Sequence, residues 1–273
     1  GMTADKGALH DLAAQGATEA QLAQAQASLA VVAGLERQAE AVKALPTRKS
    51  KLEIVHGDGA LGVSGEAFEI IFSYPEGGPS SLVSKGKEWI WRAPRPAFWR
   101  AATENDLGNK FAPETSIWSA VDAWQVCSDI KILEESEDKV SIRFTYTAPA
   151  MPELKTAVTY TISDGCLDTC VNYYGAEGRP QLPLFGLRFA TPEPVEEVSW
   201  LGLSGETYPD RKKGGLFGWH QERPDIPEYL WPQECGAHTD THQTVLRNGK
   251  HTLTFEKKEA PYIFAAVPYT PLQ

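Results

Sequence analysis

The chain has 273 residues, of which 42% are apolar and 23% are charged, and its formal net charge at pH 7 is −10. This length allows one large domain or two small ones with a sizeable core. Because proteins that bind nucleic acids or anionic membranes do so through positively charged surfaces, the acidic balance argues against both kinds of partner.

Residues 1–50 differ in composition from everything after them. The segment from Thr18 to Leu45 is rich in Ala, Gln, Glu and Leu, and Pro46 ends it. Thr18 and Gln21 have the spacing of a capping box, and the apolar residues recur on one helical face. The pattern predicts an Ala-rich helical extension or linker. Two interpretations stay open: a helix that dimerises or joins a neighbouring domain, and a helix that packs on its own domain.

From residue 51 onward, short runs of alternating apolar and polar residues are separated by turn sequences rich in Gly and Pro. Such runs predict an antiparallel sandwich or barrel, and the lack of strand–helix alternation argues against a (β/α)8 barrel on this chain. We therefore expect one mainly β domain over residues 51–273. Its clearest predicted strands are residues 51–56, 68–72, 139–147, 157–162, 166–174, 184–189, 251–256 and 262–267.

The four cysteines fit no metal-binding spacing. Cys166 and Cys170 lie in one predicted strand, where four residues separate their Cα atoms by about 13 Å, beyond the roughly 7 Å that a disulfide tolerates. Reduced thiols, together with the lack of an N-terminal apolar run of signal-peptide length, predict a cytoplasmic location.

Three stretches combine charged, aromatic and turn-forming residues. The first runs from Trp89 to Asp106 and holds three Trp, three Arg and two Pro. The prolines impose an extended or turning path, and arginines among aromatic rings are typical of interfaces. The stretch is interpreted as an inter-domain interface or as a loop that covers one end of the sandwich. Its candidate site residues are Trp99, Arg100, Asn105 and Asp106.

The second stretch runs from Trp200 to Arg211, and its glycines allow the backbone to turn tightly. Two carboxylates in such a loop suggest a glycosidase pair, but their spacing fixes no such distance, and a structural ion pair of Arg211 with one of them is the favoured interpretation. The candidate residues are Glu206, Tyr208, Asp210 and Arg211.

The third stretch runs from Tyr229 to His238 and is followed by His242. Glu234 and His238 form an alternative acid–base pair, because histidine titrates near neutral pH. With His242 they also resemble a metal-ligand set, but Gly236 argues against the helix that such a spacing needs, so we expect no metal here.

The same stretches carry a resemblance to a known family. The chain is similar to the small chain or C-terminal domain of family 2 β-galactosidases, from about Leu52 to the C-terminus, and most similar to the small subunits of heterodimeric lactases of lactic acid bacteria. The matching motifs are Phe98–Asp106, Leu184–Phe189, Gly202–Arg211 and Tyr229–Glu234.

This resemblance implies an antiparallel β-supersandwich of the galactose mutarotase-like kind. It also implies the retaining hydrolysis of terminal β-D-galactosides such as lactose. In the family the catalytic glutamates and the Mg²⁺ and Na⁺ sites lie on a (β/α)8 barrel. The resemblance therefore implies no catalytic residue, metal or cofactor on this chain, and a partner that is a catalytic barrel domain or large subunit. The eight candidates of the first two stretches would form the pocket rim or the domain interface.

Two features depart from the family pattern. The chain stops at Pro271-Leu272-Gln273, before the family's terminal Gly-Gly-x-Asp-Ser-Trp-like segment, so we expect a domain shortened at its C-terminus. The N-terminal helix has no counterpart. Two other functions stay open: a stand-alone carbohydrate-binding module that stacks tryptophans on a sugar, and an aldose 1-epimerase-like enzyme that uses Glu234 with His238 or His220.

Overall fold

The computed structural model describes residues 51–163, 165–175, 177–206, 212–225, 234–257 and 260–268. All strands paired within these residues run antiparallel. The mainly β, antiparallel sandwich expected from the sequence is confirmed. The predicted helical extension, residues 1–50, lies outside the described residues. Among those that are described, no helix combines the length and apolar content needed to cross a membrane.

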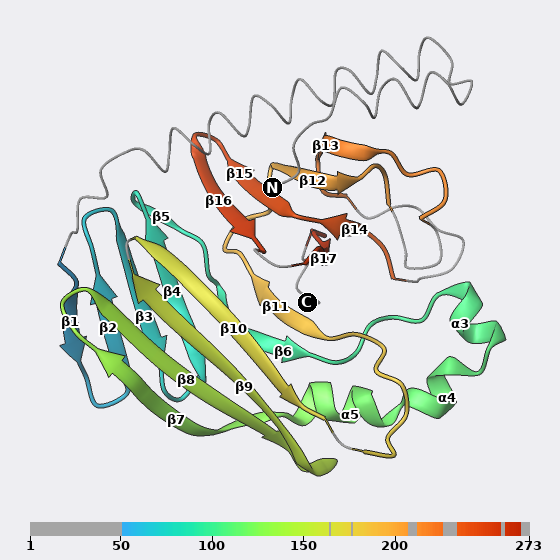
Figure 1. Ribbon diagram of the computed structural model, residues 1–273, viewed down its shortest axis with the longest axis horizontal. Helices are drawn as coiled ribbons and strands as arrows, with labels where there is room; N and C mark the ends of the chain where they lie inside the picture. Colours follow the sequence, from blue (N-terminus) through green and yellow to red (C-terminus); the bar gives the residue numbers. More distant parts are fainter. Residues whose placement is uncertain are drawn as a thin grey trace, which may run out of the picture.

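Two sheets built from strands between Glu53 and Tyr174 form a sandwich (Figure 1). The five-stranded sheet has the order β1-β2-β3-β4-β5, and the four-stranded sheet has the order β10-β9-β8-β7. The strands are β1 (Glu53–His56), β2 (Ala60–Ser64), β3 (Phe68–Ser73), β4 (Gly78–Ser84), β5 (Lys87–Glu88), β7 (Val126–Glu135), β8 (Lys139–Ala148), β9 (Met151–Ser163) and β10 (Cys166–Tyr174).

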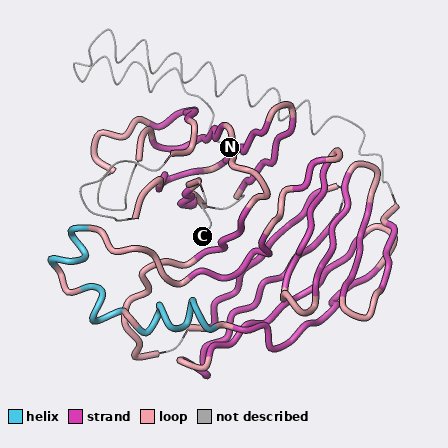
Figure 2. The backbone as a smooth tube through the Cα atoms, turned by 180° about the vertical axis from the view of Figure 1, so that it is seen from behind, coloured by secondary structure: helices cyan, strands magenta, loops and turns pink. Residues whose placement is uncertain are grey.

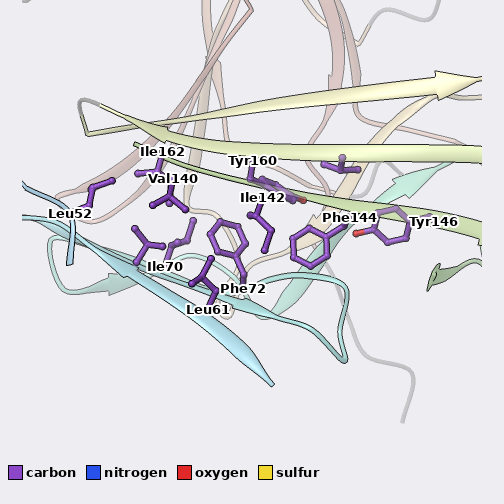
Figure 3. Packing of buried hydrophobic residues seen from close by; sticks show 12 residues of the cluster. Leu52, Leu61, Ile70, Phe72, Val140, Ile142, Phe144, Tyr146, Tyr160 and Ile162 are labelled. Atoms are coloured by element: carbon purple, nitrogen blue, oxygen red, sulfur yellow. The ribbon is translucent and has the colours of Figure 1, made fainter. Parts of the chain in front are cut away.

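The sandwich encloses the largest apolar cluster of the described residues. Figure 3 shows this cluster between the two sheets, with Phe72 of β3 facing Phe144 of β8. Their ring centroids lie 6.2 Å apart, and the Tyr160 ring of β9 lies 5.6 Å from Phe72. Because side chains alternate along a strand, the neighbours Arg143 and Thr145 point to the outer face of the four-stranded sheet.

A two-stranded ribbon and three helices lie beside the sandwich, and one strand of the ribbon and the helices come between β5 and β7 in the chain. Strand β6 (Arg92–Ala97) pairs with β11 (Gly186–Ala190), and the helices are α3 (Glu104–Gly108), α4 (Phe111–Thr115) and α5 (Ile117–Trp124). Figure 2 shows the helices gathered beside one end of the strands. Trp118 and Val121 of α5 are buried in a second apolar cluster with Phe98, which closes this end of the sandwich.

The last part of the chain forms a second group of strands. One sheet has the order β13-β12-β15-β16, and β14 pairs separately with β17. Trp89, Val198, Trp200 and Leu246 make its core. The strands are β12 (Glu197–Leu203), β13 (Phe217–Glu222), β14 (Ala237–Thr241), β15 (Gln243–Asn248), β16 (His251–Glu256) and β17 (Tyr262–Ala265).

The predicted strands are confirmed, with ends shifted by a few residues. Within the described residues the four cysteines are free thiols, as expected. Two predictions need correction. Residues 92–97 form strand β6 and not a loop, because Pro94 and Pro96 keep the chain extended in a ribbon with few ladder bonds to lose. Gly202 lies inside β12, where a Cβ atom would come within 3.1 Å of the Thr241 Cα atom, so this glycine permits close packing of β14 and makes no turn.

Candidate functional site

Where the ribbon meets the helices, Asp122 of α5 fixes the backbone that leaves β6. Its Oδ2 atom accepts hydrogen bonds from the amides of Phe98 and Trp99, at 2.7 and 3.0 Å. Arg188 of β11 donates to Asp122 Oδ1 at 3.2 Å and to the Trp99 carbonyl oxygen at 2.7 Å. These bonds hold the chain from both sides, so the direction in which it continues toward Arg100 is set by two elements far apart in sequence.

The next residue, Arg100, forms a two-point ion pair with Asp106. Its Nη1 and Nη2 atoms donate to the two carboxylate oxygens at 2.5 and 3.2 Å, and its Nε atom donates to the Pro183 carbonyl oxygen at 3.2 Å. The side chains are only 14% and 15% exposed. The guanidinium also lies over the Phe111 ring, 4.8 Å from its centroid, and Trp99 stacks on the same ring. Such forked, partly buried pairs are among the strongest polar contacts in proteins.

Asp106 is also part of the capping box at the start of helix α3. The amide and hydroxyl of Thr103 donate to Asp106 Oδ2 at 2.7 and 2.9 Å, and the Asp106 amide donates back to the Thr103 hydroxyl. Burial acts to raise the pKa of Asp106, but the hydrogen bonds from Arg100 and Thr103 and the charge of Arg100 outweigh it and lower the pKa below its ordinary value. Asp106 is therefore a charged anchor for the turn at neutral pH.

Glu234 ties the second group of strands to this turn. Its Oε2 atom accepts a hydrogen bond from the Ala101 amide at 3.0 Å, across 133 residues of sequence. Burial raises the pKa of Glu234, and the charge of Glu206 adds to the rise. The Ala101 amide, Arg100 and Arg188 oppose it without cancelling it. We call Trp99, Arg100, Asp106, Asp122, Arg188 and Glu234 the junction.

His238 of β14 belongs to a separate, buried contact. Its ring is 1% exposed and packs against the rings of Trp200 and Phe264, with centroids 4.0 and 4.8 Å away. Nδ1 donates to the Gly205 carbonyl oxygen at 2.8 Å, because a carbonyl only accepts. Nε2 lies 2.9 Å from Glu222 Oε1, so both ring nitrogens contact polar partners.

The comparisons with known proteins agree with the resemblance noted from the sequence. A family model described as beta galactosidase small chain matches residues 64–273, more than half of the chain. The chain belongs to the beta galactosidase small chain family. It is similar to a beta-galactosidase small subunit of Latilactobacillus sakei, with 37% identity over 252 residues that cover 81% of this chain and 79% of the relative.

Longer relatives contain the same stretch as a minor part. A beta-galactosidase of Clostridium acetobutylicum is 38% identical over 172 residues, which cover 62% of this chain and 19% of the relative. A beta-galactosidase of Lactobacillus delbrueckii subsp. bulgaricus is 32% identical over 240 residues, which cover 86% of this chain and 24% of the relative. The small chain family thus includes both separate chains and segments that span about a quarter or less of a longer protein.

The structure brings most of the described candidates together. Trp99, Arg100 and Asp106 are in the junction, and Glu206 acts on the pKa of Glu234. Asn105 is exposed on α3, where its carbonyl oxygen accepts a hydrogen bond from the amide of Asn109, the C-cap residue of the helix. Tyr208, Asp210 and Arg211 lie outside the described residues.

The alternative acid–base pair is not a hydrogen-bonded pair. The carboxylate that contacts His238 is that of Glu222, while Glu234 contacts the Ala101 amide. The four-residue spacing places these side chains on different sides of Gly236, whose φ of 73° turns the chain between them. Within the residues that the structure describes, no three His, Cys, Asp or Glu side chains gather as metal ligands.

Sequence reasoning missed Asp122, Arg188 and Glu222. The sequence offered one signal for Arg188, which lies in the motif Leu184–Phe189 that carries the resemblance. In the structure it faces Arg95 across the ribbon, and because two like charges in register repel each other, a nearby acid is favourable. Asp122, a single carboxylate in the apolar run of α5, is that acid.

Proposed function

We propose that this chain is the accessory, non-catalytic part of a beta-galactosidase, and that it completes the active-site rim of a catalytic (β/α)8 barrel on another domain or subunit. The reaction in this proposal is the retaining hydrolysis of terminal β-D-galactosides such as lactose by a family 2 enzyme. The catalytic carboxylates, and any Mg²⁺ or Na⁺ that the enzyme uses, belong to the barrel.

The observation that supports this proposal is the share of each relative's length that the chain matches. The chain matches 79% of a protein named a small subunit, but only 19% and 24% of two proteins named beta-galactosidases. The remaining three quarters or more of those longer proteins have no counterpart here. A division of labour between this stretch and that remainder accounts for both arrangements.

The junction provides a physical role for such an accessory part. It fixes the turn from Trp99 to Asp106 through ion pairs and backbone hydrogen bonds from the ribbon, α5 and the second group of strands. Catalytic sites require groups held within about half an ångström of productive geometry. A rigid turn at the rim of the substrate pocket would hold its residues in such a fixed position. Trp91 and Trp124 are 48% and 70% exposed, and exposed tryptophans are frequent anchors of protein interfaces.

The test is an assay of galactoside cleavage by the separate and mixed components. The purified chain, a large beta-galactosidase subunit prepared without its small chain, and their mixture are each given nitrophenyl β-D-galactoside. We expect turnover only in the mixture, with a rate that rises and saturates as the chain is added. Steady turnover by a clean preparation of the chain alone would contradict the proposal.

The epimerase alternative finds no support in the geometry. Both ring nitrogens of His238 have partners in Gly205 and Glu222, and the ring is buried against two aromatic side chains. Nε2 of His220, the other histidine of this alternative, lies 2.9 Å from the Leu216 carbonyl oxygen. A general acid–base group must reach the substrate proton within hydrogen-bond distance. We expect that adding the protein leaves the mutarotation rate of fresh α-galactose unchanged.

A further inference from the structure

A hollow of about 320 Å³ lies on the four-stranded sheet, away from the junction. All four strands of that sheet contribute to it, and they are the green and yellow strands β7 to β10 in Figure 1. Arg143 and Thr145, which alternate with buried core residues of β8, place it on the outer face. The lining residues are Ser128, Asp129, Arg143, Thr145, Lys155, Ala157 and Tyr174.

The sequence creates this hollow by placing a small residue among long ones. Ala157 of β9 faces outward in register with Thr145 of β8, yet only 3% of its surface is exposed. Two residues earlier, Lys155 pairs with Tyr174 of the edge strand β10. The methyl group of Ala157 therefore forms a floor, and the longer side chains of the lining rise around it.

Arg143 brings an unused donor to the hollow. Its Nε atom is buried and has no hydrogen-bond partner among the residues that the structure describes. A buried N–H group without a partner costs free energy, because it has lost water and gained nothing in exchange. A molecule in the hollow does not reach Nε itself, because this atom is closed to solvent. The rest of the guanidinium is not buried and forms no hydrogen bond or ion pair with the residues that the structure describes, so its other N–H groups are open to an acceptor of a bound molecule.

The remaining lining chemistry selects the class of that molecule. Arg143 and Lys155 donate, Asp129 accepts, and the hydroxyl groups of Ser128 and Thr145 do both. Tyr174, 57% exposed, adds an aromatic ring. Sugars present hydroxyl groups that donate and accept at once, together with an apolar ring face suited to an aromatic surface. The hollow also reaches the lower end of the size range of small-molecule sites.

We propose that this hollow binds a neutral saccharide at a site separate from the junction. Asp129 favours an uncharged ligand, because an anion drawn by Arg143 and Lys155 would face this carboxylate as well. The inference concerns the chain by itself and does not rest on its role in a beta-galactosidase. Failure of the mixing assay would leave it intact, and its own failure would leave the mixing assay intact.

The test is nuclear magnetic resonance of the ¹⁵N-labelled full chain titrated separately with galactose, lactose, glucose, maltose and inorganic phosphate. The Arg143 Nε–Hε group gives its own signal, which reports on changes at the guanidinium. We expect saturable shifts of this signal, and of amides around Thr145, Ala157 and Tyr174, with at least one of the four sugars and none with phosphate.

Three variants separate the proposed contacts. Tyr174→Ala and Arg143→Gln should each weaken saccharide binding roughly tenfold, the effect of losing one good polar or stacking contact. Ala157→Leu should abolish binding, because the larger side chain fills the floor of the hollow without removing a polar group. This variant tests the proposal even if Arg143→Gln fails to fold. Lys131→Gln changes a cation in register with Arg143 but outside the lining, and it should leave the affinity unchanged.

Three outcomes would overturn the proposal. Shifts with phosphate and with none of the sugars would make this an anion site. An Arg143 signal unmoved by every compound, or saccharide binding that survives Ala157→Leu, would show that the hollow holds no sugar.

Discussion

The sandwich and the junction are stabilised by opposite kinds of contact. Between the two sheets, Phe72, Phe144 and Tyr160 bury apolar surface from strands of both sheets. In the junction, two arginines and three carboxylates meet from the ribbon, the helices and the second group of strands. Apolar burial is tolerant of direction, whereas forked ion pairs require fixed geometry. We therefore expect the sandwich to supply most of the stability and the junction to determine where one turn is placed.

The largest expected effect comes from the sandwich. Phe144→Ala should lower the free energy of unfolding by about 3–5 kcal/mol, because it removes buried surface and leaves a cavity. Urea unfolding measures this loss. Val55→Ala is the control, since Val55 is 61% exposed and its loss should stay within about 0.5 kcal/mol. Equal effects of the two variants would show that this sandwich is not the main core.

Breaking the ion pair of the junction should have the next largest effect. Arg100→Ala leaves Asp106 without its two-point partner, and we expect a loss of roughly 2–3 kcal/mol in urea unfolding. Arg100→Lys should recover only part of this loss, because an ammonium group cannot donate in a fork. Arg95→Lys, the same change at an exposed position of β6, should be neutral. Full recovery by lysine would mean that charge alone matters here.

Two of the three junction carboxylates, Asp106 and Glu234, should respond to pH in opposite directions. The pKa of Asp106 is lowered from 3.8, so its contribution is present at neutral pH and is lost as the pH falls through the folded-state value. The pKa of Glu234 is raised from 4.5, so its contribution is present below 4.5 and is lost as the pH rises through the folded-state value.

Glu234→Gln tests this contrast with a smaller effect. Glutamine keeps an oxygen acceptor for the Ala101 amide but cannot ionise, so the variant should lose the fall in stability that begins above 4.5 and should equal or exceed the original protein at neutral pH. Unfolding free energies measured from below 4.5 to neutral pH give the comparison. A variant less stable than the original at neutral pH would show that the ionised carboxylate is favourable.

The smallest effect on stability should come from Tyr174→Ala. This side chain is 57% exposed on an edge strand, and we expect a change within about 0.5 kcal/mol in the same unfolding experiment. A loss comparable to that of Phe144→Ala would mean that the ring is part of the core.

The sandwich could be predicted from the sequence because its signal is local. In β8, Val140, Ile142 and Phe144 alternate with polar residues, and this period alone identifies a strand with one buried face. The ribbon strand β6 was missed because its prolines suppress the strand signal. The short helices α3 and α4 carry too few residues to show a helical period.

The junction could be predicted only in part, because its contacts join distant segments. Arg100 and Asp106 are six residues apart, and their unusual surroundings marked both. Asp122 and Arg188 gain their meaning only when α5 and β11 come together around Trp99. No spacing in the sequence indicates that Glu234 would contact Ala101 and not His238.

The most direct test of the account compares Arg100→Lys with Arg95→Lys and the original chain as each is titrated into a large beta-galactosidase subunit. The rate of nitrophenyl galactoside cleavage is measured at saturation. We expect all three chains to be inactive alone. The original and Arg95→Lys chains should restore the same rate, and Arg100→Lys should restore a lower one. A folded Arg100→Lys chain that restores the full rate, or any chain that cleaves the substrate alone, would contradict this account.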